Sequence, residues 1–162
     1  MMSKIEVEVV GVRIEMPANQ PILLLKASEP AYYLPIWVGA IEANALSIAQ
    51  RGLTPPRPMA HALLLDVLAK YEAELEDVTI TGKDGQIFLA ELNTNDGKSI
   101  SARPSDAVTL ALTAHCPVYV DSELLEESGI EAPEADEEEV AQFRDFLDNV
   151  SAEDFETGPE NP

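Results

Sequence analysis

The sequence predicts an α+β domain with an antiparallel or mixed sheet, built from two β-β-β-α units. Three observations support this prediction. Stretches that alternate apolar and polar residues, as half-buried strands do, are separated by hairpin turn residues. Apolar residues at helical spacing follow each group of strands. The same order of strands and helix recurs without a gap when the 162-residue chain is shifted by 64 positions.

The first unit begins with alternating apolar residues over 5–15, which indicate a strand. The phase of the alternation switches beside Gly11, and this switch predicts a β-bulge. Two further strands are predicted over 22–27 and 34–38, after a proline-containing turn. A helix is predicted over 42–51, because Gly52 follows as a stop signal.

A connecting helix is predicted between the two units. Pro58 is well placed as its first helical residue, and the helix is expected to run to about Glu74. Its predicted apolar face consists of Leu64, Val67, Leu68 and Tyr71, which recur at helical spacing.

The second unit repeats the pattern of the first. Gly85 and Gly97 mark its hairpin turns, and Pro104 begins its helix. Ser122 can cap a last, short helix. The predicted strands are 78–81, 86–93, 98–102 and 117–120, and the predicted helices are 104–114 and 122–129.

The 64-residue shift places Glu42 on Asp106. Each acid lies at the start of a helix that follows a strand, where the helix dipole stabilises a carboxylate by about 0.3–1 kcal/mol. A true internal duplication would relate the two carboxylates by a pseudo-two-fold axis. The alternative is that two β-β-β-α units resemble each other by pattern alone.

Charge divides the chain into a folded domain over 1–130 and an acidic appendage over 131–162. The first part carries nine basic and eighteen acidic residues, and the second carries one basic and twelve acidic residues. The net charge of −20 excludes attraction of the whole molecule to nucleic acid or to an anionic membrane. Any polyanion must therefore bind at a local cationic patch or through metal ions.

The chain is expected to be a soluble cytoplasmic protein. Its start lacks a secretory hydrophobic stretch, and no apolar run reaches the ~18 residues of a membrane span. The single cysteine, Cys116, excludes an internal disulfide framework and is expected to be a small buried hydrophobe. A homodimer or higher homo-oligomer is also expected. The basis is the aromatic content at Tyr32, Tyr33 and Trp37 together with open sheet edges.

The acidic appendage contains one further predicted helix after a mobile linker over 133–139. Such a helix is marginal alone in water, so we expect it to dock on its own domain or on a neighbouring subunit. Residues 156–162 are expected to be disordered. The apolar stripe of the predicted helix consists of Val140, Phe143, Leu147 and Val150, with Phe146 alongside.

Three stretches in a fixed order resemble the bacterial bifunctional nuclease domain family. They are LPIWVG over 34–39 followed by Glu42, PRP over 56–58 followed by His61, and ARPSDA over 102–107. The resemblance covers roughly residues 5–130. It implies a compact α+β domain and, for some members, hydrolysis of both DNA and RNA.

Phosphodiester hydrolysis needs an activated water and neutralisation of charge on the phosphoryl oxygens, which divalent ions held by carboxylates can supply. Glu42 and Asp106 are the candidate catalytic carboxylates and the candidate ligands of Mg²⁺ or Mn²⁺. His61 is the candidate general acid or base, because imidazole titrates near neutral pH.

Phosphate binding is assigned to Arg57, Arg103 and Ser105. Arg103 directly precedes a helix start, where anions bind well. Each residue also has a structural alternative, such as an ion pair between Arg103 and Asp106. The sequence therefore leaves two hypotheses open. One is a metal-dependent nuclease of DNA or RNA, and the other is a non-catalytic interaction or regulatory module, which the charge of −20 favours.

Overall fold

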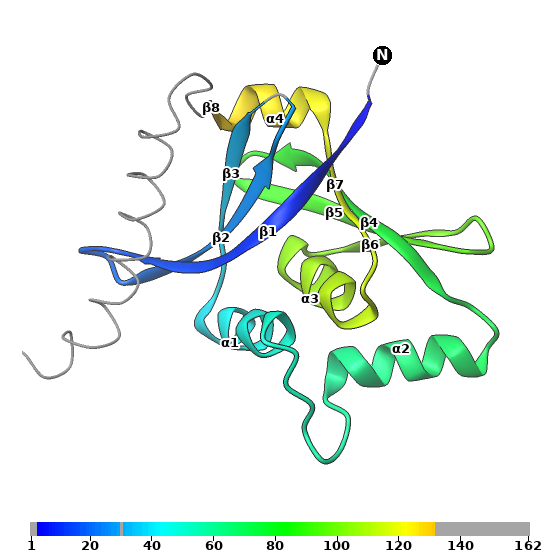
Figure 1. Cartoon of the computed structure of the whole chain (residues 1–162). Helices are drawn as coiled ribbons and strands as arrows, with labels where there is room; N and C mark the ends of the chain where they lie inside the picture. The colour runs from blue at the N-terminus through cyan, green and yellow to red at the C-terminus, as the bar shows by residue number, and fades with distance from the viewer. Residues whose placement is uncertain (1–2, 30, 132–162) are drawn as a thin grey trace, which may run out of the picture.

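The computed structural model describes residues 3–29 and 31–131. Strands and helices alternate in two β-β-β-α groups with one helix between them and a short β-α-β ending (Figure 1). The strands are β1 (Lys4–Glu15), β2 (Gln20–Ala27), β3 (Tyr32–Trp37), β4 (Leu75–Asp84), β5 (Ile87–Thr94), β6 (Ser99–Ala102), β7 (Val118–Asp121) and β8 (Ile130–Glu131). The helices are α1 (Ala40–Gln50), α2 (Ala60–Lys70), α3 (Pro104–Ala114) and α4 (Ser122–Ser128).

The strands form one eight-stranded sheet in the order β6-β5-β4-β7-β1-β2-β3-β8. Neighbouring strands run antiparallel except for β4 and β7, which pair in parallel, so the sheet is mixed. The predicted α+β class with an antiparallel or mixed sheet is confirmed. Each unit has the predicted order of three strands and a helix, while the duplication of one ancestral unit stays a prediction.

The core lies between the sheet and the pair of helices α1 and α3, which lie side by side in Figure 1. Buried leucine, isoleucine and valine side chains from both units fill it. Its largest fully buried members are Leu23, Leu25, Leu34, Leu46, Ile80, Leu110 and Leu125.

The β-bulge predicted at Gly11 is present. The register of β1 against β2 shifts between Val9 and Gly11, and Gly11 adopts a φ of 137°. Residues with a side chain rarely adopt this backbone conformation, so a glycine at this position permits the bulge. Beyond the bulge, apolar residues of β1 again lie on the side of the strand that packs against the core, and the strand continues.

The connecting helix differs from its prediction in length and orientation. It begins at Ala60 with Met59 as N-cap, not at Pro58, and it ends at Lys70, not near Glu74. Glu72 has a φ of 61°, a left-handed conformation that a helix cannot continue through. None of the residues of α2 is buried, and of the predicted apolar residues within it Leu64 and Val67 are exposed while Leu68 is partly buried. The inner side of the helix is partly buried at His61, Ala62, Leu65 and Leu68.

Two helix starts also differ from prediction. Helix α1 begins at Ala40, two residues before the predicted start. The side chain of Asp121, not that of Ser122, caps α4 by accepting a hydrogen bond from the Glu123 amide at 3.0 Å. The Ser122 hydroxyl instead accepts a hydrogen bond from the Ser3 amide at 3.3 Å.

The last described element is β8, which pairs with the start of β3. The predicted linker, amphipathic helix and disordered end all lie beyond it, outside the described residues.

None of the described helices has the length and hydropathy of a membrane span. Of the three aromatic residues expected at an interface, Tyr33 is buried and Tyr32 is half-buried, while Trp37 is exposed. The predicted oligomer itself stays a prediction.

Candidate active site

Glu42 and Asp106 occupy equivalent positions at the starts of α1 and α3. Gly39 is the N-cap of α1 and Arg103 is the N-cap of α3, and each acid is the third helical residue after its cap. Neither N-cap side chain caps its helix by a hydrogen bond. The free amides of both first turns therefore favour negative charge at these two positions.

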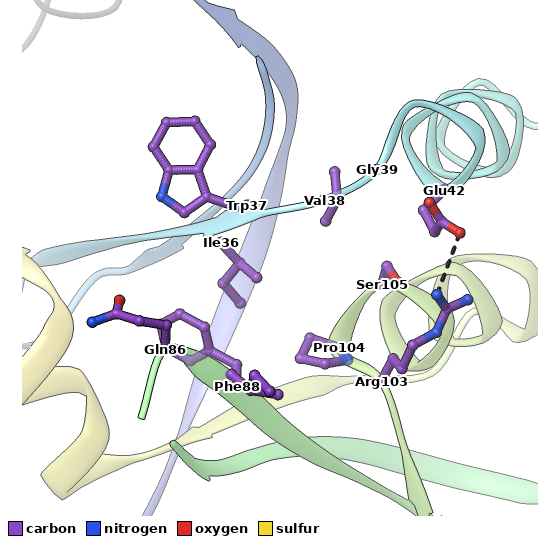
Figure 2. A pocket seen from close by; sticks show the side chains of 11 residues that line it. Ile36, Trp37, Val38, Gly39, Glu42, Gln86, Phe88, Arg103, Pro104 and Ser105 are labelled. Atoms are coloured by element: carbon purple, nitrogen blue, oxygen red, sulfur yellow. Dashed lines mark hydrogen bonds and ion pairs between the residues drawn. The ribbon is translucent and has the colours of Figure 1, made fainter. Parts of the chain in front are cut away.

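Arg103 joins the two carboxylates. Its Nε donates to Asp106 Oδ2 at 2.8 Å, and its Nη1 donates to Glu42 Oε2 at 3.3 Å. Figure 2 shows Arg103 reaching from the start of α3 to Glu42 at the start of α1. The Arg103 side chain is 62% exposed, so a molecule from solvent can contact it.

His61 completes the cluster from the first turn of α2. Its Nε2 lies 2.9 Å from Asp106 Oδ1. Asp106 Oδ2 already accepts from Arg103, so both oxygens of this one carboxylate bind side chains from different parts of the chain. Because an ionised carboxylate can only accept, Nε2 carries the hydrogen and donates the hydrogen bond. Nδ1 is then the basic nitrogen of a neutral imidazole.

These contacts change the ionisation of the cluster. Partial burial raises the pKa of Asp106, but the hydrogen bonds from Arg103 and His61 outweigh it and hold this pKa below its ordinary value. The hydrogen bond to Asp106 raises the pKa of Arg103 above its already high ordinary value. Asp106 is therefore ionised and Arg103 is charged throughout the physiological pH range.

In this arrangement the two candidate metal ligands are paired with a side chain. Among the described residues, no group of three or more His, Cys, Asp or Glu side chains is placed to hold a metal. Glu42 and Asp106 direct their oxygens at one cation, but that cation is the Arg103 guanidinium. The two carboxylates converge as predicted, while the position expected for Mg²⁺ or Mn²⁺ is taken by a side chain.

The other two predicted phosphate ligands are placed differently. Ser105 is buried beside Arg103, as the second residue of α3. Arg57 is exposed in the loop before α2, and among the described residues no hydrogen bond or ion pair joins it to the cluster. Of the six predicted site residues, five are therefore adjacent and Arg57 stands apart.

A cavity of about 260 Å³ opens beside Arg103 and Glu42. It lies between the end of β3, the start of β5 and the start of α3 (Figure 2). Trp37 is 54% exposed at its rim, and its ring points to the opposite side of β3 from Ile36. The sequence pattern carried no signal for this cavity, because its walls come from both units. Among its lining residues are Trp37, Gln86, Ile87, Phe88, Arg103 and Ser105.

A second cavity, of about 270 Å³, is lined by His61, which does not line the first. It is bounded by α1, the loop before α2, the start of α2, and α3, and its walls are mostly apolar. His61 thus contacts Asp106 and also lines an apolar hollow. The walls of this hollow include Ile41, Ile48, Leu53, Met59, His61 and Thr109.

Comparison with known proteins covers the part of the chain that carries the cluster. The sequence profile described as the bifunctional nuclease domain matches residues 22–133, a range that contains all the cluster residues. Two proteins from two strains of Mycobacterium tuberculosis, both described as uncharacterized, are each 43% identical to this chain over 159 residues. The alignments cover 93% of this chain and 97% of each relative.

Proposed function

Because the chain belongs to the bifunctional nuclease domain family, we propose that it hydrolyses phosphodiester bonds of DNA or RNA at the cluster of His61, Asp106 and Arg103. One observation carries this proposal. A single carboxylate, Asp106, binds an imidazole and a guanidinium at 2.9 Å and 2.8 Å. A proton acceptor and a phosphate ligand are thereby held next to each other, as hydrolysis of a phosphodiester requires.

His61 is the proposed general base. Asp106 accepts a hydrogen bond from the protonated Nε2 of His61, and this bond orients the ring. The carboxylate also stabilises the imidazolium that forms when Nδ1 takes a proton from water. The same imidazolium can return the proton to the leaving oxygen. Positioned acid–base catalysis of this kind contributes about 10²–10⁴-fold to a rate.

Arg103 is the proposed phosphate ligand. Guanidinium carries five N–H donors, and the bonds to Asp106 and Glu42 use two of them. The remaining donors and the amides at the start of α3 can bind the phosphoryl oxygens. Glu42 then acts as a positioning residue that holds the guanidinium over the mouth of the cavity.

The acidic surface limits how the substrate binds. The chain carries a net charge of −20, so a nucleic acid gains attraction from a few local cations only. We expect weak binding with a shallow dependence on salt. The predicted requirement for Mg²⁺ or Mn²⁺ stays a prediction, and no step of the proposed chemistry uses a metal.

The test is a nuclease assay on single- and double-stranded DNA and RNA, in Mg²⁺, Mn²⁺ or EDTA. The chain has two histidines, and His115 lies at the other end of α3, so His115→Gln is a matched control for His61→Gln. We expect His61→Gln to lower the rate about 100-fold or more while His115→Gln keeps it. Equal rates in wild type and His61→Gln would refute the proposed site and indicate a contaminating nuclease.

The non-catalytic interaction module stays the second candidate. The observation that favours it is the outer side of α2, where Leu63, Val67 and Tyr71 are exposed. An enzyme of this size does not need such a surface, whereas an interaction module does. Absence of hydrolysis under every metal condition, with the fold intact, would favour this candidate.

A further inference from the structure

Two helices and the loop between them expose several large apolar side chains. The surface is formed by α1, the loop after it, and α2, and we call it the α1–α2 face. No residue of α2 is buried, although the helix consists mainly of leucine, valine and alanine. The α1–α2 face comprises Ile41, Leu53, Met59, Leu63, Leu64, Val67 and Tyr71, each at least 40% exposed.

A helix in this situation needs a covering partner. An isolated helix of eleven residues is marginal in water, and α2 gains little burial from its main neighbour, α3. Large contiguous apolar patches are rare on monomeric proteins and usually mark a binding surface. The apolar cavity of about 270 Å³ opens on the same face, with Ile41, Leu53 and Met59 in its walls.

The part of the chain that forms the α1–α2 face is not acidic, unlike the rest of the protein. From the start of α1 to the end of α2, residues 40–70 carry three basic and two acidic side chains, although the whole chain has a net charge of −20. Arg51 and Arg57 lie in the loop beside the apolar cavity, and Lys70 lies in the last turn of α2. A ligand that fits this face is therefore apolar in its centre and acidic around it.

The C-terminal segment of the same chain has this composition. Residues 131–162 carry twelve acidic side chains and one basic side chain. Phe143, Leu147 and Val150 recur at spacings of four and three, with Val140 and Phe146 beside them, so one side of a helix would be apolar and the other polar, directly after the acidic run 134–139. We propose that residues 140–150 dock on the α1–α2 face of their own chain.

A second copy of the chain fits this face less well. A symmetric dimer would bring the same patch of each copy together, and with it Arg51, Arg57 and Lys70 of both copies. The C-terminal segment instead offers carboxylates to these three cations, from the acidic run 134–139 and from Asp145 and Asp148. Complementary charges thus select the C-terminal segment over self-association.

The chain is long enough for this contact. The described fold ends at Glu131, which pairs with Tyr32 at the start of β3. β3 has six residues and spans about 20 Å, and α1 begins three residues after it. Residues 132–139 span up to about 26–29 Å when extended, so residue 140 can reach α1, where Ile41 begins the face.

The mycobacterial relatives also align with part of the chain after residue 133. The family profile stops at residue 133, but the alignment with the mycobacterial relatives covers 93% of the 162 residues and therefore extends well beyond that point. The proposed docking does not depend on the nuclease activity. It would, however, place carboxylates beside the cavity that His61 lines.

Hydrogen exchange of the full chain, followed by mass spectrometry, tests the proposal. Phe143→Ser combined with Phe146→Ser removes the centre of the apolar stripe, and Phe155→Ser is the matched control outside it. We expect the double variant to exchange about tenfold or more faster than wild type in both 60–70 and 140–150, with Phe155→Ser unchanged. Unchanged exchange in β4 and β5 confirms that the fold is intact in each variant.

Three outcomes would overturn docking on the own chain. The first is exchange of 60–70 that does not respond to the double variant. The second is random-coil exchange of 140–150 in wild type. The third is protection of 60–70 that disappears on dilution, because it would assign the face to another copy. The reciprocal variant Val67→Ser with Tyr71→Ser changes only exposed side chains, and it must release 140–150 if the contact exists.

Discussion

His61 Nε2 lies 2.9 Å from Asp106 Oδ1, across 45 positions of the sequence. The contact joins the first turn of α2 to the first turn of α3. Because the opposite oxygen of Asp106 accepts from Arg103, this carboxylate sets both the ring orientation of the histidine and the position of the guanidinium. Five predictions follow from the contacts of the cluster and of the helix that carries Asp106.

Asp106→Asn should keep the fold and lower the rate of phosphodiester hydrolysis by about 10²–10⁴-fold. The amide has the shape of the carboxylate but no charge, so it favours the wrong tautomer of His61 and releases Arg103. The pH profile separates this positioning role from a purely structural one, because the acidic limb, which reports protonation of the proposed base, should shift when the neighbouring charge is removed. A profile and rate like those of wild type would exclude Asp106 from the site.

The same variant should show over which pH range the ion pair of Asp106 with Arg103 stabilises the protein. Asp106 has a pKa below its ordinary value of 3.8 in the folded state, so its contribution to stability is present above pH 3.8. That contribution is lost as the pH falls through the lowered folded-state pKa. Urea unfolding of wild type and Asp106→Asn between pH 2 and 7 should therefore give a difference in unfolding free energy that shrinks in acid. A constant difference would contradict the assigned ionisation.

Gly39→Ala should disturb Glu42 with little effect on stability. A Cβ on Gly39 would collide with Glu42 Oε1, which is the mobile end of a side chain and can move away. The displaced carboxylate loosens Arg103, and we expect activity to fall between about 10- and 100-fold. Gly82→Ala is the control, since a Cβ there meets no atom within 4 Å. Thermal unfolding should give similar midpoints for Gly39→Ala and wild type, and unaltered activity would show that Glu42 does not position Arg103.

Cys116 should react slowly with thiol reagents in the native protein. Burial, with a smaller effect from Asp77, raises the pKa of its thiol to about 11. Little thiolate is present at pH 8, and the thiolate is the reactive form. Modification by a disulfide reagent should accelerate strongly in urea, where the thiol returns to its ordinary pKa. Fast modification without denaturant would show that the thiol is exposed.

His115→Gly should stabilise the protein. His115 ends α3 in the left-handed conformation with a φ of 59°, which costs a residue with a side chain about 1–2 kcal/mol. Glycine removes this cost and adds some entropy to the unfolded chain, so we expect a gain of about 0.5–1 kcal/mol in unfolding free energy. Ala114→Gly, one residue earlier and inside the helix, should have the opposite sign. Chemical denaturation of the two variants measures both effects.

Much of the fold was predictable because it depends on local rules. The alternation over β1, its phase switch at Gly11 and the glycines of the hairpin turns indicated the strands and the bulge. Helix α3 runs over the predicted residues 104–114, since Pro104 favours its start and the chain turns left-handed at His115. The parallel pairing of β4 with β7 joins strands about forty residues apart, and no local pattern specifies it.

The helix α2 shows where periodicity fails. Its sequence is apolar on most sides, so more than one stripe has helical spacing. The predicted set at helical spacing included Leu64, Val67 and Leu68, and of these three only Leu68 is partly buried while the other two are exposed. Packing against α3 selected the stripe of His61, Leu65 and Leu68. That choice brings His61 to Asp106.

The sequence by itself determined the order of strands and helices, the charge division near residue 130, and the residue types of the cluster. Only the tertiary structure decided their relationship. It placed the Arg103 guanidinium between Glu42 and Asp106, where a metal ion was expected, and it left Arg57 apart. The physical reason is range: helix and turn preferences act over a few residues, whereas the cluster depends on how α1, α2 and α3 pack on one another.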